Sequence, residues 1–127
     1  MTTKQLLAAL ALALCGPACA AGNHAHEHQP LHGGIVTEVA DIDYELVAQP
    51  DTLTLHLRDH GKPLALDGAS AKLTLLNGSE KTEATLSPAG DGKLQAKGSF
   101  KVAPGTKVAA LVTVPGTKAA NVRFAVK

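Results

Sequence analysis

Runs in which apolar and polar residues alternate one by one dominate the chain from Ile35 onward. In the clearest run, Leu53, Leu55 and Leu57 alternate with polar residues. Successive side chains of a β-strand point to opposite faces of a sheet, so this spacing predicts strands with one apolar face. The same part of the chain lacks the three- to four-residue apolar spacing of an amphipathic helix. The alternation therefore favours an all-β domain.

Turn-forming residues divide these runs into short segments. Asn77-Gly78 predicts a hairpin turn, because both residues tolerate a positive φ. Residues 87–92 and Pro115-Gly116 end two further runs. The predicted strands cover residues 35–39, 42–48, 52–58, 70–75, 81–86, 93–100, 108–114 and 120–126.

Seven or eight strands at a spacing of roughly 8–12 residues predict an antiparallel β-sandwich of immunoglobulin-like architecture over residues 35–127. A small closed barrel is the alternative. The chain has no tryptophan, and its aromatic residues are Tyr44, Phe100 and Phe124. An antibody-type domain, which has a core tryptophan and an inter-sheet disulfide, is therefore excluded.

Residues 1–20 have the three-part pattern of a secretory signal peptide. A lysine gives the positive start, residues 5–15 are apolar, and small residues precede a cleavage point near Ala20 or Ala21. The apolar run of about 11 residues is too short to span a bilayer. We therefore expect export to the periplasm and no transmembrane span after cleavage. A lipoprotein anchored at Cys19 is the alternative, although the preceding residues fit a lipobox poorly.

Cleavage changes which chemistry is available. Both cysteines, the single methionine and one lysine lie in the signal peptide. The mature chain of about 106 residues then has no sulfur, and it has eleven basic against eleven acidic residues. Thiol catalysis, disulfide exchange and thiolate or thioether metal sites are thereby excluded. A neutral chain also lacks the basic field of a nucleic-acid-binding protein.

The segment 21–34 contains four of the six histidines of the chain. Its histidine, glycine, alanine and proline residues bury little apolar surface, so we expect a flexible arm. Imidazole is the commonest metal-binding side chain, and an imidazole and carboxylate set without sulfur suits Zn(II), Cu(II), Ni(II) or Co(II). A histidine-rich linker that holds no metal is the alternative. The predicted metal ligands are His24, His26, His28 and His32, with Glu27 as an optional oxygen ligand.

The cleavage point bears on the choice of metal. A chain that begins Gly22-Asn23-His24 has a free amine, two amides and an imidazole in the third position. These four nitrogens form a square-planar set, which favours Cu(II) or Ni(II). A chain that begins at Ala21 lacks this set.

Two further histidines lie outside the arm. His56 belongs to the polar face of the 52–58 strand, and we interpret it as an exposed cross-strand residue. His60 follows Asp59 and precedes Gly61, and we interpret it as a turn residue. If His32 folded back beside His56 and His60, these three imidazoles would form a site.

Known catalytic motifs are absent from the sequence. It contains no Gly-x-Ser-x-Gly elbow, Walker loop, dinucleotide fingerprint or His-Glu-x-x-His pattern. We therefore expect a protein that is not an enzyme.

Several short motifs give a resemblance to a known group of proteins. They are His32-Gly33-Gly34 and residues 43–47, 57–63, 72–76, 86–90 and 96–100. With them, the chain resembles small periplasmic proteins of proteobacterial heavy-metal resistance loci. It is also similar to the N-terminal β-domain of cobalt–zinc–cadmium type efflux adaptor (membrane fusion) subunits. The resemblance implies a periplasmic β-sandwich linked to divalent metal efflux, although this chain has no coiled-coil hairpin, lipoyl or barrel domain of a complete adaptor.

The expected function is binding of a divalent transition metal in the periplasm. The protein would act as a metal buffer or as a carrier that hands ions to a heavy-metal efflux complex. The competing interpretation is a non-metal interaction module that docks a partner by a sheet face or an edge strand. In that interpretation the arm is a spacer.

Overall fold

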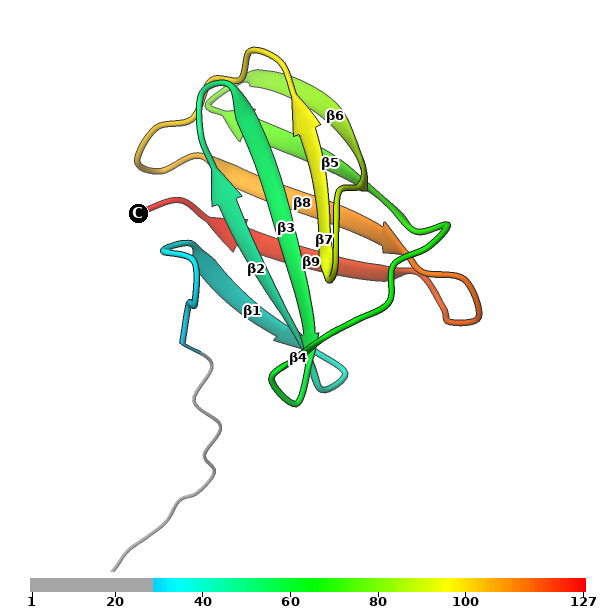
Figure 1. Ribbon diagram of the computed structural model, residues 1–127. Coiled ribbons are helices and arrows are strands. Elements are labelled where there is room, and N and C mark those ends of the chain that lie inside the picture. The colour runs from blue at the N-terminus through cyan, green and yellow to red at the C-terminus, as the bar shows by residue number, and fades with distance from the viewer. Residues whose placement is uncertain (1–28) are drawn as a thin grey trace, which may run out of the picture.

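The computed structural model describes residues 29–127, and these residues form nine β-strands and no helix (Figure 1). The described part of the chain accordingly contains no helix that is long and apolar enough to cross a membrane. The strands are β1 (Ile35–Val39), β2 (Ile42–Ala48), β3 (Thr52–Asp59), β4 (Lys62–Pro63), β5 (Ser70–Asn77), β6 (Glu80–Pro88), β7 (Lys93–Lys97), β8 (Lys107–Thr113) and β9 (Ala120–Ala125). All eight predicted strands are present, and the two-residue β4 is an addition.

All paired strands are antiparallel, and the sheet follows the order β1-β2-β3-β7-β6-β5-β8-β9, with β4 paired to β3. The long strand β6 joins the two halves of this sheet, because it pairs with β5 and, through Ser87 and Pro88, with β7. The first and last strands then lie side by side. Between them, the Thr37 hydroxyl donates a hydrogen bond of 2.8 Å to the Arg123 carbonyl. The sheet is therefore nearly closed into a barrel.

The predicted all-β, antiparallel class is confirmed. The pairing describes one continuous sheet, so the finer prediction of an immunoglobulin-like sandwich with two separate sheets is not what the strand order shows. The small barrel that the sequence left open as an alternative describes the pairing better. Alternation reports which residues face the core, and a sandwich and a barrel bury the same faces of their strands.

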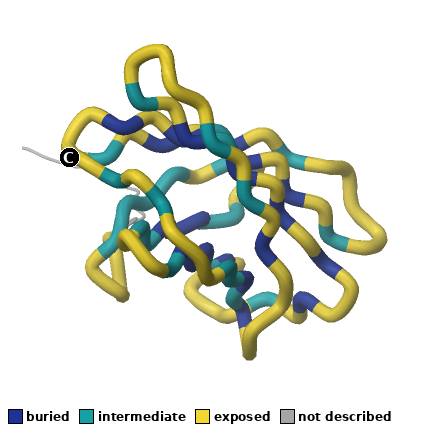
Figure 2. Tube along the Cα trace, turned by 90° about the horizontal axis from the view of Figure 1, so that it is seen from above, coloured by how far each residue is buried: buried dark blue, intermediate teal, exposed yellow. Residues whose placement is uncertain are grey.

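The core lies between the two halves of the sheet and is built mainly from leucines (Figure 2). The alternation seen in the sequence produces it, since Leu53, Leu55 and Leu57 of β3 are all at most 1% exposed. Two charged residues, Glu45 and Arg58, are also buried among the described residues. They lie on the opposite face of the sheet from the leucines, where residues 29–34 contact them.

Candidate functional site

The residues before β1 cover the outer face of β2 and β3. Glu45 lies on this face because its neighbours in β2, Tyr44 and Leu46, point into the core. The strand register places Glu45 opposite His56 of β3. Glu45 is nevertheless 0% exposed, because residues 29–34 fold back over it.

The Glu45 carboxylate binds this N-terminal segment through its backbone. Oε1 accepts a hydrogen bond of 2.9 Å from the Leu31 amide. Oε2 accepts hydrogen bonds from the amides of His32 at 2.8 Å and Gly34 at 2.9 Å. Three backbone groups that have no strand partner are thus satisfied by one side chain. We call Glu45 and Arg58, with these three amides, the Glu45 clamp.

Arg58 completes the Glu45 clamp from β3. Its Nη1 donates to Glu45 Oε1 at 2.8 Å, and its Nη2 donates to the Gln29 carbonyl at 3.3 Å. The Arg58 residue is 6% exposed. A buried ion pair is tolerated when further hydrogen bonds satisfy both partners, and the backbone of residues 29–34 supplies them here.

The Glu45 clamp also sets the protonation state of its carboxylate. Burial alone would raise the pKa of Glu45. The Arg58 guanidinium and the three backbone amides outweigh burial, because each favours the charged form, and together they lower the pKa of Glu45 to about 2. The carboxylate is therefore ionised throughout the physiological pH range.

The last residues of the predicted arm contact the sheet. Residues 31–34 are bound to Glu45 through the backbone amides of Leu31, His32 and Gly34. Gly34 allows the close approach, because a Cβ at this position would overlap the Leu46 carbonyl of β2. Composition gave no sign of this anchoring, since its partner is a charged residue on a distant strand.

The Glu45 clamp brings His32 onto His56. Their imidazole rings are stacked, with centroids 3.7 Å apart and planes inclined by 10°. His56, expected to be an exposed cross-strand residue, is therefore partly covered by the last histidine of the arm. Burial and the neighbouring His32 lower the pKa of His56, and the cations Lys93 and Arg58 add to this against the opposing effect of Glu45. The His56 imidazole is thus mainly neutral at pH 7.

A hollow of about 400 Å³ opens beside the two rings. Its charged lining residues are Arg58, Asp91 and Lys93, and the loop 89–92 forms one wall. This loop is fixed to β3, because the Leu57 amide donates a hydrogen bond of 2.8 Å to the Gly92 carbonyl. Solvent and small ions can therefore approach the two histidines from this side.

His60 does not join the pair. In the turn between β3 and β4, His60 and Gly61 both have positive φ, 53° and 82°, as a two-residue type I′ turn requires. The His60 ring lies 2.6 Å from the Asp59 carboxylate, and its side chain is 81% exposed. The interpretation of His60 as a turn residue is confirmed, and the three-imidazole site of His32, His56 and His60 is not formed.

The remaining predicted ligands, His24, His26, Glu27 and His28, lie outside the described residues, as does the signal peptide. Within residues 29–127, no group of three or more histidine, cysteine, aspartate or glutamate side chains is placed to hold a metal ion. Among the described residues, the histidines that lie next to each other are His32 and His56.

Sequence reasoning missed the Glu45 clamp. One signal was available: Glu45 interrupts the apolar run from Tyr44 to Val47, and Arg58 lies on the polar face of the next strand. Opposite charges on the same outer face of neighbouring strands indicate a cross-strand ion pair there, although not that a further partner covers it. The identity of that partner, the backbone of residues 29–34, was not visible in the pattern.

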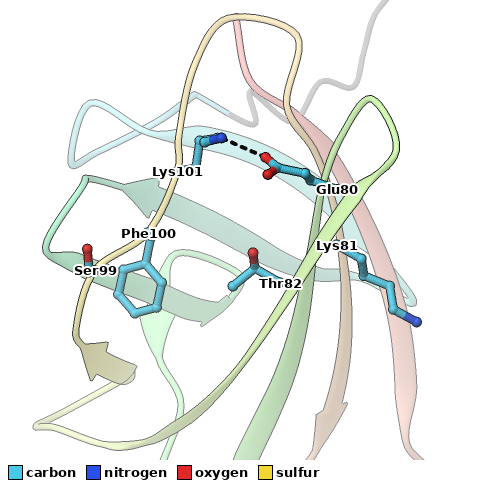
Figure 3. A pocket seen from close by; sticks show the side chains of 6 residues that line it. All are labelled: Glu80, Lys81, Thr82, Ser99, Phe100 and Lys101. Atoms are coloured by element: carbon cyan, nitrogen blue, oxygen red, sulfur yellow. Dashed lines mark hydrogen bonds and ion pairs between the residues drawn. The ribbon is translucent and has the colours of Figure 1, made fainter.

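A second hollow, of about 470 Å³, lies between the start of β6 and the segment after β7 (Figure 3). Glu80 and Lys101 point toward each other across it and form an ion pair of 2.6 Å. Both side chains are 63% exposed, so the pair is screened by solvent. This hollow contains none of the predicted ligands. Its other lining residues are Lys81, Thr82, Ser99 and Phe100.

Comparisons of the chain with protein-family models, with curated proteins and with solved structures found no match.

Proposed function

We propose that this protein is exported to the periplasm and binds a divalent transition metal there, as a buffer or as a carrier for a heavy-metal efflux complex. The proposed metals are Zn(II), Cu(II), Ni(II) and Co(II), which accept imidazole and carboxylate ligands. The proposed ligands are His24, His26, His28 and His32, with Glu27 as an optional oxygen ligand.

The position of His32 is the observation that carries the proposal. A fully flexible histidine tract binds a metal weakly, because ordering each residue of the tract costs entropy. Here the Glu45 clamp already fixes the backbone of His32. His28 is four residues from His32 in the sequence, so only a short stretch of chain separates this proposed ligand from the fixed residue. Part of the conformational entropy that metal binding would cost the arm is therefore already lost in the folded protein.

The link to export and efflux rests on the sequence. The signal peptide pattern of residues 1–20 supports a periplasmic location. The resemblance to small periplasmic proteins of heavy-metal resistance loci, and to the N-terminal β-domain of cobalt–zinc–cadmium type efflux adaptor subunits, supports a role beside an efflux complex.

Calorimetry on the mature chain tests metal binding. We compare the unchanged chain with a variant in which His24, His26 and His28 are replaced by asparagine, which leaves residues 29–34 and the Glu45 clamp intact. Micromolar binding of at least one of the four metals, weakened at least about tenfold in the variant, supports the proposal. Equal, millimolar binding by both proteins overturns it.

A non-metal interaction module is the second candidate function. One observation favours it: Leu31 and His32 contact Glu45 through their backbone amides, so the arm would be held equally well with other side chains at these two positions. In this case the Glu45 clamp sets the direction in which a spacer leaves the sheet. Millimolar metal binding in the calorimetry would favour this candidate.

A further inference from the structure

We propose that His56 is a metal ligand carried by the sheet, that it binds the same ion as His32, and that Glu45 is the positioning residue that holds His32 for it. This inference rests on the proposed function and deepens it, since it turns an arm-borne site into one shared between the arm and β3. The ligand is a single borderline-soft divalent cation such as Zn(II) or Cu(II).

The contact between the two rings places them within reach of one ion. Two imidazoles that bind one tetrahedral Zn(II) at about 2.0–2.1 Å place their nitrogens about 3.3 Å apart. The ring centroids of His32 and His56 are 3.7 Å apart. Rings that diverge from a shared ion have their centroids farther apart than their nitrogens, so the stack has to open before both rings can bind one ion. The two side chains are nevertheless in contact, so a small movement brings both within reach of it.

The orientation of the rings indicates what must change when a metal binds. A ring nitrogen binds a metal in the plane of its ring, and the planes of His32 and His56 are inclined by only 10°. Lone pairs in nearly parallel planes do not converge on one point. One ring therefore has to swing out of the stack, and it can turn into the neighbouring hollow, which both histidines line.

His32 is the ring that is free to swing. His56 belongs to β3, which pairs with β2 on one side and β7 on the other. His32 precedes β1, and its amide is bound to Glu45 at 2.8 Å. This bond fixes the backbone of His32 while its side-chain torsions remain available. Glu45 thus keeps His32 beside His56 in both the stacked and the opened arrangement.

Fixed charges of both signs surround this place: Glu45 favours a positive charge near His56, whereas Lys93 and Arg58 oppose one. Arg58 is the nearest fixed cation in the Glu45 clamp, and its charge is compensated by Glu45 at 2.8 Å. In the hollow, Lys93 is accompanied by Asp91. The remaining coordination positions are open to water, which reaches both rings through the hollow.

The test uses the full mature chain and matched histidine variants. His56→Asn removes the sheet ligand, and His60→Asn removes an exposed histidine of the same hairpin as a control. We expect the Zn(II) affinity measured by calorimetry to fall at least about tenfold in H56N and to stay unchanged in H60N. Equal affinities of H56N and the unchanged chain overturn the inference.

A direct readout separates coordination from stacking. Nitrogen-15 NMR of the histidine rings reports the atoms that bind Zn(II). We expect zinc to shift the ring nitrogens of both His32 and His56 and to leave those of His60 in place. A shift of His32 without His56 overturns the inference, even if H56N lowers the affinity by disturbing the stack.

Glu45→Gln tests the positioning role, with Glu45→Asp as the conservative variant. We expect E45Q to weaken zinc binding at least about tenfold and to abolish the zinc-induced shift of the His56 ring, and E45D to restore part of both. Unchanged binding in a folded E45Q overturns the role of Glu45. If E45Q fails to fold, the H56N and NMR results still decide whether His56 is a ligand.

The outcomes also separate this inference from the proposed function. If the triple variant of His24, His26 and His28 loses binding while H56N keeps it, the metal is held by the arm alone and the shared site is wrong. If the unchanged chain binds all four metals only at millimolar concentration, both proposals fail together.

Discussion

Glu45 and Arg58 form an ion pair of 2.8 Å on the outer face of the sheet, and the chain before β1 seals it from solvent. A pair of this kind differs from the exposed Glu80–Lys101 pair in what happens when one partner is lost. In the buried case the remaining charge stays without water or a counter-ion, whereas in the exposed case water replaces the partner.

Replacement of Glu45 by alanine should therefore be strongly destabilising. We expect the free energy of unfolding to fall by about 3–5 kcal/mol, because Arg58 would be left uncompensated and three amides would lose their acceptor. Urea denaturation followed by circular dichroism measures the change. Glu80→Ala is the matched control, with an expected loss of at most about 1 kcal/mol. Similar losses in the two variants would contradict the prediction.

Stability should depend on pH through Glu45. Its pKa is lowered from 4.5 to about 2 in the folded protein, so the unfolded chain takes up the proton first as the pH falls. The stabilisation, about 3 kcal/mol by linkage, is fully present above pH 4.5 and is lost as the pH falls toward 2. Urea denaturation between pH 2 and 6 measures it. A Glu45→Gln variant with the same pH dependence as the unchanged chain would show that other carboxylates are responsible.

His56 should titrate below its ordinary value of 6.5, because burial and His32 disfavour its charged form. Since the folded-state pKa is depressed, the associated stabilisation is present above pH 6.5 and decreases as the pH falls below it. Replacement of His32 by alanine should raise the pKa of His56 toward its ordinary value. Proton NMR of the ring signals follows the titration, and Lys118→Ala is a remote control. An unchanged His56 titration in H32A would argue against the stacked contact.

Gly34 and its neighbour Gly33 should respond differently to alanine. A Cβ at Gly34 would overlap the Leu46 carbonyl, whereas a Cβ at Gly33 meets nothing within 4 Å. At Gly33 the cost is the left-handed backbone alone, about 1–2 kcal/mol. Gly34→Ala should instead displace residues 31–34 from Glu45, expose the Glu45 amide partners to hydrogen exchange and separate the rings of His32 and His56. Hydrogen exchange of the 31–34 amides measures the displacement, and equal protection in both variants would contradict it.

Most strands could be predicted from the sequence, because each buries one face and therefore alternates. Leu53, Leu55 and Leu57 illustrate this, since all are buried as expected. One turn was predicted one residue too early. Asn77 ends β5 and pairs with Glu80, so the hairpin turn consists of Gly78 and Ser79 and not of Asn77 and Gly78. The order of the strands could not be predicted, because alternation specifies faces and not neighbours.

The candidate site was predictable only in part. The histidine pattern drew attention to His32 and His56 separately, but their contact depends on residues 31–34 folding back onto Glu45. That fold-back is a long-range interaction between a backbone segment and a buried carboxylate, and no local pattern encodes it. His60 could be assigned correctly, because Asp59 and Gly61 beside it specify a turn.

The contact between the first strand, β1, and the last strand, β9, which we call the seam, has a consequence for how the chain folds. Its hydrogen bond joins Thr37 and Arg123, which are 86 residues apart in the sequence. Loop-closure entropy delays contacts of such long separation, so the local hairpins form early and the seam forms late. Until β9 has docked on β8, the edges of β1 and β8 both remain open to pairing with other chains. Docking of β9 therefore protects these two edges from intermolecular pairing during folding, and we expect a chain truncated before β9 to be less soluble.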